Sequence, residues 1–361
     1  MSQLGVALLG ITHPHASGRL RALLADATVA IRGVADDHDV VVPFAEHFGL
    51  ERRSTEAILD DPAVDAVLVH AKSEEMHTLG AAALRAGKAV LVEKPAGRTL
   101  ADLELLAAAA DETGGVCQVG YTYRYSQAIA FADRVLADEL LGDVVQVRVH
   151  GACSLHEAAT SHINQPGDMG GALWVIGSHV VDLIVHQFGL PASVNARVPK
   201  FPELFDAAYR EDAAAATLLY DDLLVALDFM SWDPLPWVES WDVSIYGTRG
   251  ILHACPLPAR CEIYLSQPGG GLPAGWTRWQ QESFPIAWAA TTTDYSPELA
   301  EIKNDELFTR EIAAFLAAIR GAAPTGATAQ SARDVARVID ACYASSRQDG
   351  AAVELPASNP S

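Results

Sequence analysis

The chain has 361 residues, more than one hydrophobic core usually serves, so we expect two domains. Half of the residues are hydrophobic and 20% are charged, which excludes a wholly disordered chain. The formal net charge of −21 at pH 7 would repel phosphate groups, so we expect neither nucleic acid nor a membrane surface as a partner.

The cysteines and the N-terminus indicate the compartment. The five cysteines are odd in number and include no C-x-x-C pair. The N-terminal residues lack the basic leader and the small-residue cleavage site of a signal peptide. The longest apolar stretch, residues 170–190, contains two histidines and an aspartate, which are costly in hydrocarbon. We therefore expect a cytoplasmic protein in which this stretch is a buried helix.

The first third of the chain alternates short apolar runs with alanine-rich helical stretches. This pattern is typical of βαβ units and a buried parallel sheet. We expect strands over residues 4–9, 29–35, 65–70, 89–92 and 116–119. Helices are expected over residues 15–24, 41–48, 77–86 and 100–112.

From about residue 144 the expected strands follow one another with fewer helices between them. They cover residues 144–150, 216–220, 223–229, 243–246 and 261–265. Helices are expected over residues 170–189, 306–319 and 332–345, and residues 275–296 are tryptophan-rich and irregular. The pattern predicts a second, largely antiparallel α+β domain.

A strand-turn-helix segment near the N-terminus has features of a dinucleotide site. Dinucleotide folds place glycines in this turn so that a pyrophosphate can approach the helix N-terminus. Only Gly10 fits, because Thr12 and His15 occupy the second and third glycine positions. An ordinary β-α turn is the alternative interpretation. The candidate contacts are Gly10, Ile11, Thr12, His13 and Pro14.

Two acids follow the second expected strand. Asp36 is placed to accept hydrogen bonds from an adenosine ribose, and Asp37 adds negative charge where a 2′-phosphate would need an arginine. This favours NAD over NADP as the cofactor. The alternative is that the two acids only cap a loop.

Glu93, Lys94 and Pro95 end another buried strand. The carboxyl edge of a parallel sheet is where such folds bind ligands. An ammonium group there can stabilise a developing alkoxide while a neighbouring base removes the proton. Lys94 is therefore a catalytic candidate.

The apolar helix expected over residues 170–189 contains a third candidate site. His179, Asp182 and His186 are spaced i, i+3 and i+7, so they share one helix face. A buried histidine can accept a substrate proton near neutral pH. The three side chains also have the chemistry of a divalent metal site, or of a hydrogen-bonded core pair. We expect no metal, because no cysteine joins them.

Together these motifs resemble the glucose-fructose oxidoreductase and inositol dehydrogenase family (Gfo/Idh/MocA). The resemblance covers nearly the whole chain. It rests on the Gly10 turn, on Asp65-Ala-Val, on residues 83–95 ending in Glu-Lys-Pro, on Val-Gly-Tyr-Thr-Tyr-Arg-Tyr at 119–125, on residues 170–182 and on the segment from Phe315 to Ser346.

The resemblance implies an α/β protein with two domains. An N-terminal Rossmann dinucleotide-binding domain would cover residues 1–122 and hold NAD, with Ala71, Lys72, Glu93 and Lys94 among its contacts. A C-terminal α+β domain over residues 123–350 would carry a large, mainly antiparallel open sheet. This sheet would form a homodimer or homotetramer interface. Whether the C-terminal helix packs back on the first domain is left open.

The family also implies roles for two residues. Lys94 would bridge the substrate hydroxyl and the nicotinamide, and His179 would act as acid and base during hydride transfer at a sugar or polyol carbon. Tyr123 and Arg124 would line the substrate pocket.

Three departures from the family pattern bear on the substrate. Val175 stands where the family commonly has an aspartate, four residues before the helix histidine. Residues 71–74 read Ala-Lys-Ser-Glu instead of the usual Ala-Thr-Pro-Asn, and the first turn contains His13 and His15. A loop that carries His156, His162 and Asn164 could supply the polar groups for the substrate that Val175 does not offer.

The first expectation is an NAD-dependent dehydrogenase that acts on a secondary alcohol of a sugar, cyclitol or glycoside. One alternative is a redox-neutral enzyme that uses NAD for epimerisation, elimination or glycoside cleavage through a keto sugar. A non-catalytic sensor of NAD or a sugar is the next alternative. A metal-dependent lyase or isomerase is the last, and it requires an ion on the 179/182/186 face.

Overall fold

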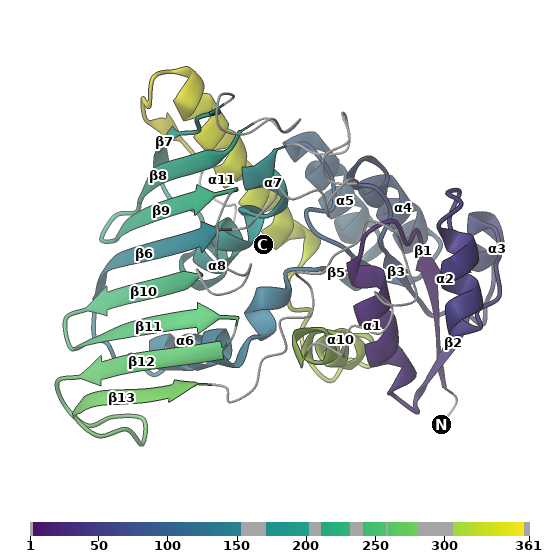
Figure 1. Cartoon of the computed structure of the whole chain (residues 1–361), viewed down its shortest axis with the longest axis horizontal. Helices are drawn as coiled ribbons and strands as arrows, with labels where there is room; N and C mark the ends of the chain where they lie inside the picture. The colour runs from purple at the N-terminus through teal and green to yellow at the C-terminus, as the bar shows by residue number, and fades with distance from the viewer. Residues whose placement is uncertain are drawn as a thin grey trace. The chain divides into compact units, whose positions relative to one another are not determined.

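The computed structural model describes six stretches of the chain, residues 3–152, 171–201, 211–231, 241–257, 259–280 and 306–356 (Figure 1). They belong to two compact units. Of the described residues, the first unit contains 3–122 and 306–333, and the second contains the remainder. In the part of the chain described, no helix is long and apolar enough to cross a membrane.

The first unit is built on a parallel sheet in the order β2-β1-β3-β4-β5. The strands are β1 (Leu4–Leu9), β2 (Val29–Ala35), β3 (Ala66–Val69), β4 (Ala89–Val92) and β5 (Cys117–Val119). A single parallel bridge between Val34 and Arg52 extends the sheet beyond β2. With that bridge the order matches the 3-2-1-4-5-6 order of a Rossmann fold, in which ligands bind where the strand order reverses.

Helices cover both faces of this sheet (Figure 1). They are α1 (His15–Leu24), α2 (Val41–Phe48), α3 (Thr55–Leu59), α4 (Ser73–Arg85), α5 (Leu100–Thr113) and α10 (Glu306–Ile319). Leu20 of α1, Phe44 of α2 and Phe315 of α10 share one buried cluster with Leu8 of β1. On the opposite face, α4 and α5 pack together against β4, where Gly80 lies close to Val92.

The second unit is built on a nine-stranded sheet in the order β13-β12-β11-β10-β6-β9-β8-β7-β14. Its strands are β6 (Val144–Ala152), β7 (Ser193–Arg197), β8 (Ala213–Leu219), β9 (Leu224–Met230), β10 (Asp242–Gly247), β11 (Gly250–Pro256), β12 (Ala259–Leu265), β13 (Gly275–Gln280) and β14 (Val353–Glu354). Strands β6 and β9 are parallel, and the other pairs are antiparallel. The expected fold class, a Rossmann sheet followed by a mainly antiparallel sheet, is confirmed.

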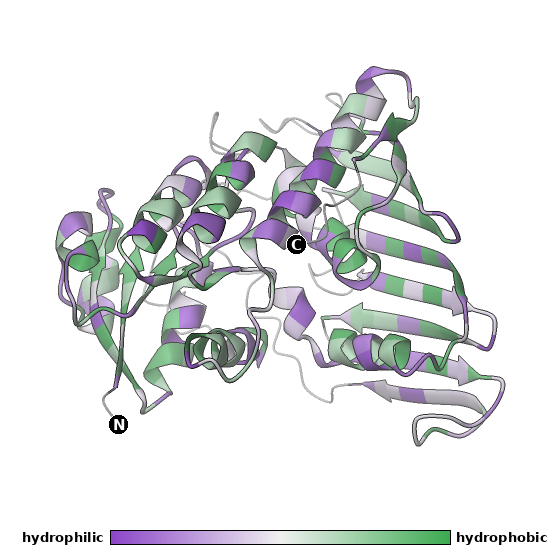
Figure 2. Ribbon diagram, turned by 180° about the vertical axis from the view of Figure 1, so that it is seen from behind, coloured by the Kyte–Doolittle hydropathy of each residue, from purple (hydrophilic) through white to green (hydrophobic). Residues whose placement is uncertain are grey.

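One face of the second sheet is buried by helices. Exposure alternates residue by residue along β12, and Figure 2 shows the matching alternation of apolar and polar bands along the strands. The helices of this unit are α6 (Gln127–Ala137), α7 (Ala172–Val175) and α8 (Ser178–Phe188), together with the 3-10 helix η1 (Thr122–Tyr125). The last helix, α11 (Ala329–Arg347), begins in the first unit and continues in the second.

The prediction of a single helix over residues 170–189 was wrong, because α7 and α8 are separate helices. At Gly177 a Cβ atom would lie 2.8 Å from the Leu173 carbonyl oxygen, so the chain turns where only glycine fits. The tryptophan-rich stretch expected to be irregular instead begins with β13, whose residues 276 to 279 alternate between the two faces of the sheet. Strands β7 and β11 and helices α3 and α6 were not predicted.

We expect Gly10→Ala to destabilise the first unit more than Gly49→Ala. Both glycines have positive φ, 73° and 64°, so each alanine carries the left-handed penalty of about 1–2 kcal/mol. Only at Gly10 would the new Cβ atom collide, 2.6 Å from the Ala71 Cα atom, which adds about 1–3 kcal/mol. Urea unfolding of the two variants measures the difference. Equal losses in the free energy of unfolding would contradict the close approach of Gly10 to Ala71.

Candidate functional site

The turn after β1 is held at the carboxyl edge of the first sheet. The Gly10 amide donates to the Ala35 carbonyl at 2.7 Å, and the His13 amide donates to the His70 carbonyl at 2.9 Å. These bonds tie the turn to the ends of β2 and β3. Pro14 precedes α1, so the turn leads directly into the helix N-terminus.

Asp36 fixes the same turn from the end of β2. Its Oδ2 accepts a hydrogen bond from the Ile11 amide at 2.6 Å, and its Oδ1 accepts one from the His38 amide at 2.8 Å. Each carboxylate oxygen has a second lone pair that can accept a ribose hydroxyl. Asp37 is exposed beside it.

Other residues expected to contact the cofactor lie on the same edge. The Ala71 backbone packs against Gly10, and Lys72 precedes α4. The Thr12 hydroxyl lies 3.4 Å from the His70 carbonyl oxygen. The turn, Asp36, Ala71 and Lys72 therefore follow three neighbouring strands and meet at one edge of the sheet.

A buried charge network lies at the end of β4. Glu93 is fully buried, and one of its oxygens, Oε2, accepts a hydrogen bond from Arg19 of α1. Arg19 also donates to Glu311 of α10 at 2.7 Å and to the Gly120 carbonyl at 3.4 Å. Burial alone would raise the pKa of Glu93, but Arg19 together with His15 and His13 outweighs burial and holds that pKa well below its usual range. Glu93 is therefore a carboxylate near neutral pH.

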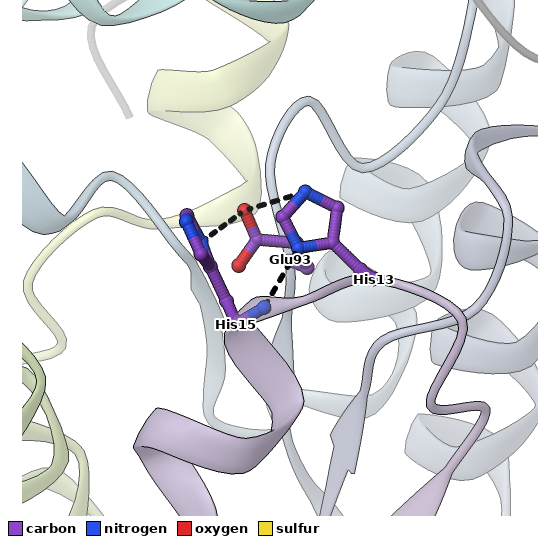
Figure 3. A group of neighbouring side chains, drawn as sticks. All are labelled: His13, His15 and Glu93. Atoms are coloured by element: carbon purple, nitrogen blue, oxygen red, sulfur yellow. Dashed lines mark hydrogen bonds and ion pairs between the residues drawn. The ribbon is translucent and has the colours of Figure 1, made fainter. Parts of the chain in front are cut away.

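His13 and His15 face the other oxygen of Glu93 (Figure 3). The His15 Nδ1 atom lies 3.2 Å from Glu93 Oε1, and the His13 Nε2 atom lies 3.8 Å from it. Burial lowers the pKa of His15, and the charge of Glu93 only partly opposes this effect. Neutral His15 then donates from Nδ1 to the carboxylate.

Lys94 follows Glu93 directly, and only 2% of its surface is exposed.

In the second unit, Tyr123 and Arg124 of η1 both contact side chains of α8. The Tyr123 ring stacks on the His179 ring at 4.5 Å, and Trp241 meets Tyr123 edge-on at 4.9 Å. Arg124 donates to both oxygens of Asp182, at 2.9 and 2.6 Å. Burial raises the pKa of Asp182, and Arg124 opposes this effect.

The three acid and imidazole groups of α8 do not converge. Asp182 pairs with Arg124, whereas His186 lies 2.9 Å from Asp133 of α6. The carboxylate of this face thus pairs with a guanidinium, and one of its imidazoles lies beside a second carboxylate. Within the described residues, the one group with metal-ligating geometry is His13, His15 and Glu93.

Val175 is buried in α7, so the position that carries an aspartate in the family is apolar here. His156, His162 and Asn164, which were expected to supply polar groups in its place, lie outside the described residues.

Sequence reasoning missed Arg19 and Glu311. Each lies among the buried residues of its helix, between apolar neighbours such as Leu20 and Ile312. A charged residue on an otherwise apolar helix face needs a buried partner, and this signal was present in both helices.

The sequence matches two descriptions of one family. Residues 4–121 match "Oxidoreductase family, NAD-binding Rossmann fold", and residues 134–355 match "Oxidoreductase family, C-terminal alpha/beta domain". The expected NAD-binding Rossmann domain is thereby confirmed.

Individual curated relatives match only part of the chain. The chain is 31% identical over 143 residues to the scyllo-inositol 2-dehydrogenase (NADP(+)) of Bacillus subtilis, which is 40% of each chain. It is 27% identical over 158 residues to the levoglucosan dehydrogenase of Pseudarthrobacter phenanthrenivorans, 42% of this chain and 40% of that protein. The matched segments thus span about half or less of these curated relatives.

Solved structures match over almost the full length. A protein of gentamicin A biosynthesis in complex with NAD, GenD2, superposes with a TM-score of 0.76 at 26% identity, covering 99% of this chain and 97% of that one. An oxidoreductase from Agrobacterium radiobacter with NAD+, L-tartaric acid and magnesium superposes with a TM-score of 0.81 at 17% identity, covering 98% of each chain. At 17% identity the likeness shows the fold alone.

We expect Glu311→Gln to lower the free energy of unfolding of the first unit by about 3–5 kcal/mol, because the buried Arg19 loses a charged partner. Glu306→Gln is the matched control, because Glu306 lies in the same helix and pairs with exposed Arg310. Glu306→Gln should lower the free energy of unfolding by less than about 1 kcal/mol. Chemical unfolding compares the two variants. Similar losses in the free energy of unfolding would contradict a larger contribution from the buried ion pair than from the exposed one.

Proposed function

The chain belongs to the Gfo/Idh/MocA oxidoreductase family, and from this membership we propose that it transfers a hydride between a secondary alcohol of a sugar, cyclitol or glycoside and NAD. The observation that carries the proposal is the placement of Lys94. It follows β4 as a buried lysine at the sheet edge where the Gly10 turn and Asp36 also lie.

The residues of the first unit fit a dinucleotide. Gly10 leaves the space that a Cβ atom would fill, and the turn leads into the N-terminus of α1, which favours a pyrophosphate. Asp36 would accept the ribose hydroxyls, and the negative charge of Asp37 disfavours a 2′-phosphate. When bound, NAD supplies the hydride acceptor or donor.

Lys94 is proposed to stabilise charge on the substrate oxygen. Its ammonium donates to the alcohol oxygen, whose negative charge grows as the proton leaves. Glu93 does not compete for the substrate, because Arg19 occupies one of its oxygens and the imidazoles of His13 and His15 face the other.

His179 is proposed to take up and return the hydroxyl proton. The stacked Tyr123 ring restricts the imidazole plane, and the Arg124–Asp182 pair fixes α8 one turn further on. A restricted ring presents the same nitrogen to each substrate, which general acid-base catalysis requires.

The second sheet supports a homodimer or homotetramer. The face opposite α6 and α8 exposes four large hydrophobic side chains, those of Leu219, Leu224, Tyr264 and Trp276. They form two cross-strand pairs, Leu219 with Leu224 and Tyr264 with Trp276, with β11, β10 and β6 between them. We propose that these pairs contact another copy of the chain. The four described cysteines are free and buried, in keeping with a cytoplasmic protein.

The direct test is a screen of the purified full chain with NAD against polyols, cyclitols, aldoses and glycosides. Absorbance reports NADH, and mass spectrometry reports the products. We expect NADH together with a ketone product. A changed product without NADH would favour the redox-neutral alternative, and tight binding of NAD and sugar without any product would favour the sensor.

We expect Lys94→Ala to lower kcat about 10²–10³-fold, because the developing oxyanion loses its donor, while the Kd for NAD changes little. Lys88→Ala is the control, since Lys88 is also buried in the first unit but donates to the carbonyls of Asp61 and Val64. It should reduce stability with far less effect on kcat. Steady-state kinetics and NAD titration separate the two, and an equal loss of NAD binding and turnover in Lys94→Ala would limit the residue to cofactor positioning.

A further inference from the structure

Two imidazoles and one carboxylate converge beside the N-terminus of α1 (Figure 3). His13, His15 and Glu93 are all buried, and each offers one ligand atom within 4.8 Å of the other two. Dinucleotide binding does not require this arrangement, because glycine is the usual residue at the position of His15.

We propose that His13, His15 and Glu93 bind one divalent transition-metal ion such as Zn²⁺, with a fourth coordination position open. Two histidines and one glutamate form a known ligand set for zinc sites that keep an open position. Imidazole nitrogen and carboxylate oxygen also suit the neighbouring first-row metals.

Two of the three separations between ligand atoms fit this coordination, and all three atoms lie within 4.8 Å of one another. Zn²⁺ bonds of about 2.0–2.1 Å in a tetrahedron place neighbouring ligand atoms roughly 3.3–3.5 Å apart. The separations from Glu93 Oε1 are 3.2 Å to His15 Nδ1 and 3.8 Å to His13 Nε2, so they bracket that value. Small side-chain rotations would complete the site.

Arg19 provides the outer support that metal ligands usually have. It holds Glu93 by Oε2, so Oε1 remains directed at the two imidazoles. Partners that orient a ligand raise metal affinity. Binding through His15 Nδ1 requires the tautomer protonated at Nε2, so the metal replaces the hydrogen bond from Nδ1 to Glu93.

Two further features oppose metal binding and limit the affinity for the ion. His13 Nδ1 accepts the His15 amide at 3.2 Å, so ligation by Nε2 requires the other tautomer and gives up that long hydrogen bond. The positive charges of Arg19 and Lys94 are matched by Glu93 and Glu311, so the pocket has no net negative charge to attract a cation. We therefore expect a reversible site and not a permanently filled one.

One consequence rests on the proposed function. His13 belongs to the turn that we assign to the pyrophosphate, so the ion and NAD should alter each other's affinity. The metal would then regulate cofactor binding from within the cofactor site.

The test uses the metal-free full chain, Zn²⁺ and a competing chromophoric chelator. We expect one ion per chain, with the Kd raised at least tenfold in His13→Gln and in His15→Gln. His47→Gln is the matched control, because His47 is an exposed histidine of α2 in the same unit, and it should leave the Kd unchanged. Binding that is equal in all four proteins would overturn the site.

His13→Cys keeps the proposal testable if a glutamine variant does not fold. It should still bind Co²⁺ and should show a thiolate-to-cobalt charge-transfer band that the unaltered chain lacks. Absence of this band in folded His13→Cys would overturn the assignment.

A titration of Zn²⁺ with and without NAD separates the two proposals. A Zn²⁺ Kd that changes with NAD concentration supports both of them. Zn²⁺ binding that depends on His15 but ignores NAD would retain the metal site and contradict the placement of the pyrophosphate.

Discussion

Arg19 is fully buried in α1, and a buried guanidinium is tolerated only when its donors are satisfied. Its partners are Glu93 after β4, Glu311 of α10, His70 after β3 and the Gly120 carbonyl after β5. One side chain thus joins three strand ends to a helix that lies almost three hundred residues further along the chain. The orientation of Glu93 depends on it, and through Glu93 so do the backbone at Lys94 and the two imidazoles.

The second unit repeats this arrangement with different residues. Arg124 holds Asp182, and His179 precedes Asp182 by about one helical turn. Lys94 and His179, the two proposed catalytic residues, are therefore each next to a buried pair of arginine and carboxylate. Such pairs contribute little net stability when complete, but losing one partner is costly, so they resist displacement. This is a physical reason for both side chains to keep a defined position.

Local sequence patterns predicted the elements well where neighbours in sequence determine them. The expected ranges of β1, β2, β4, α1 and α2 coincide with those observed, because apolar periodicity and glycine positions are local signals. Residue patterns also predicted a parallel sheet followed by a largely antiparallel domain, with NAD as the cofactor, and the family resemblance implied the same. The observed sheets and the matches to the two family domains confirm these predictions.

Contacts between distant residues were not predictable in the same way. No pattern near Arg19 specifies Glu311, and no pattern near Asp182 specifies Arg124. Asp36 was expected at a ribose but also accepts the Ile11 amide. The spacing of His179, Asp182 and His186 placed them on one helix face. It did not reveal that Asp182 pairs with Arg124 and His186 with Asp133. Each of these outcomes depends on which helices pack together, and helical periodicity alone does not determine that.

The proposed function requires NAD to bind at the carboxyl edge of the first sheet, between the Gly10 turn and the Glu93-Lys94 strand end. Hydrogen-deuterium exchange of the full chain with and without saturating NAD tests it most directly. We expect slower exchange in peptides that cover residues 10–19 and 36–38, and unchanged exchange in peptides of the β12–β13 hairpin. Unchanged exchange in the Gly10 turn, with NAD shown to be bound, would contradict it.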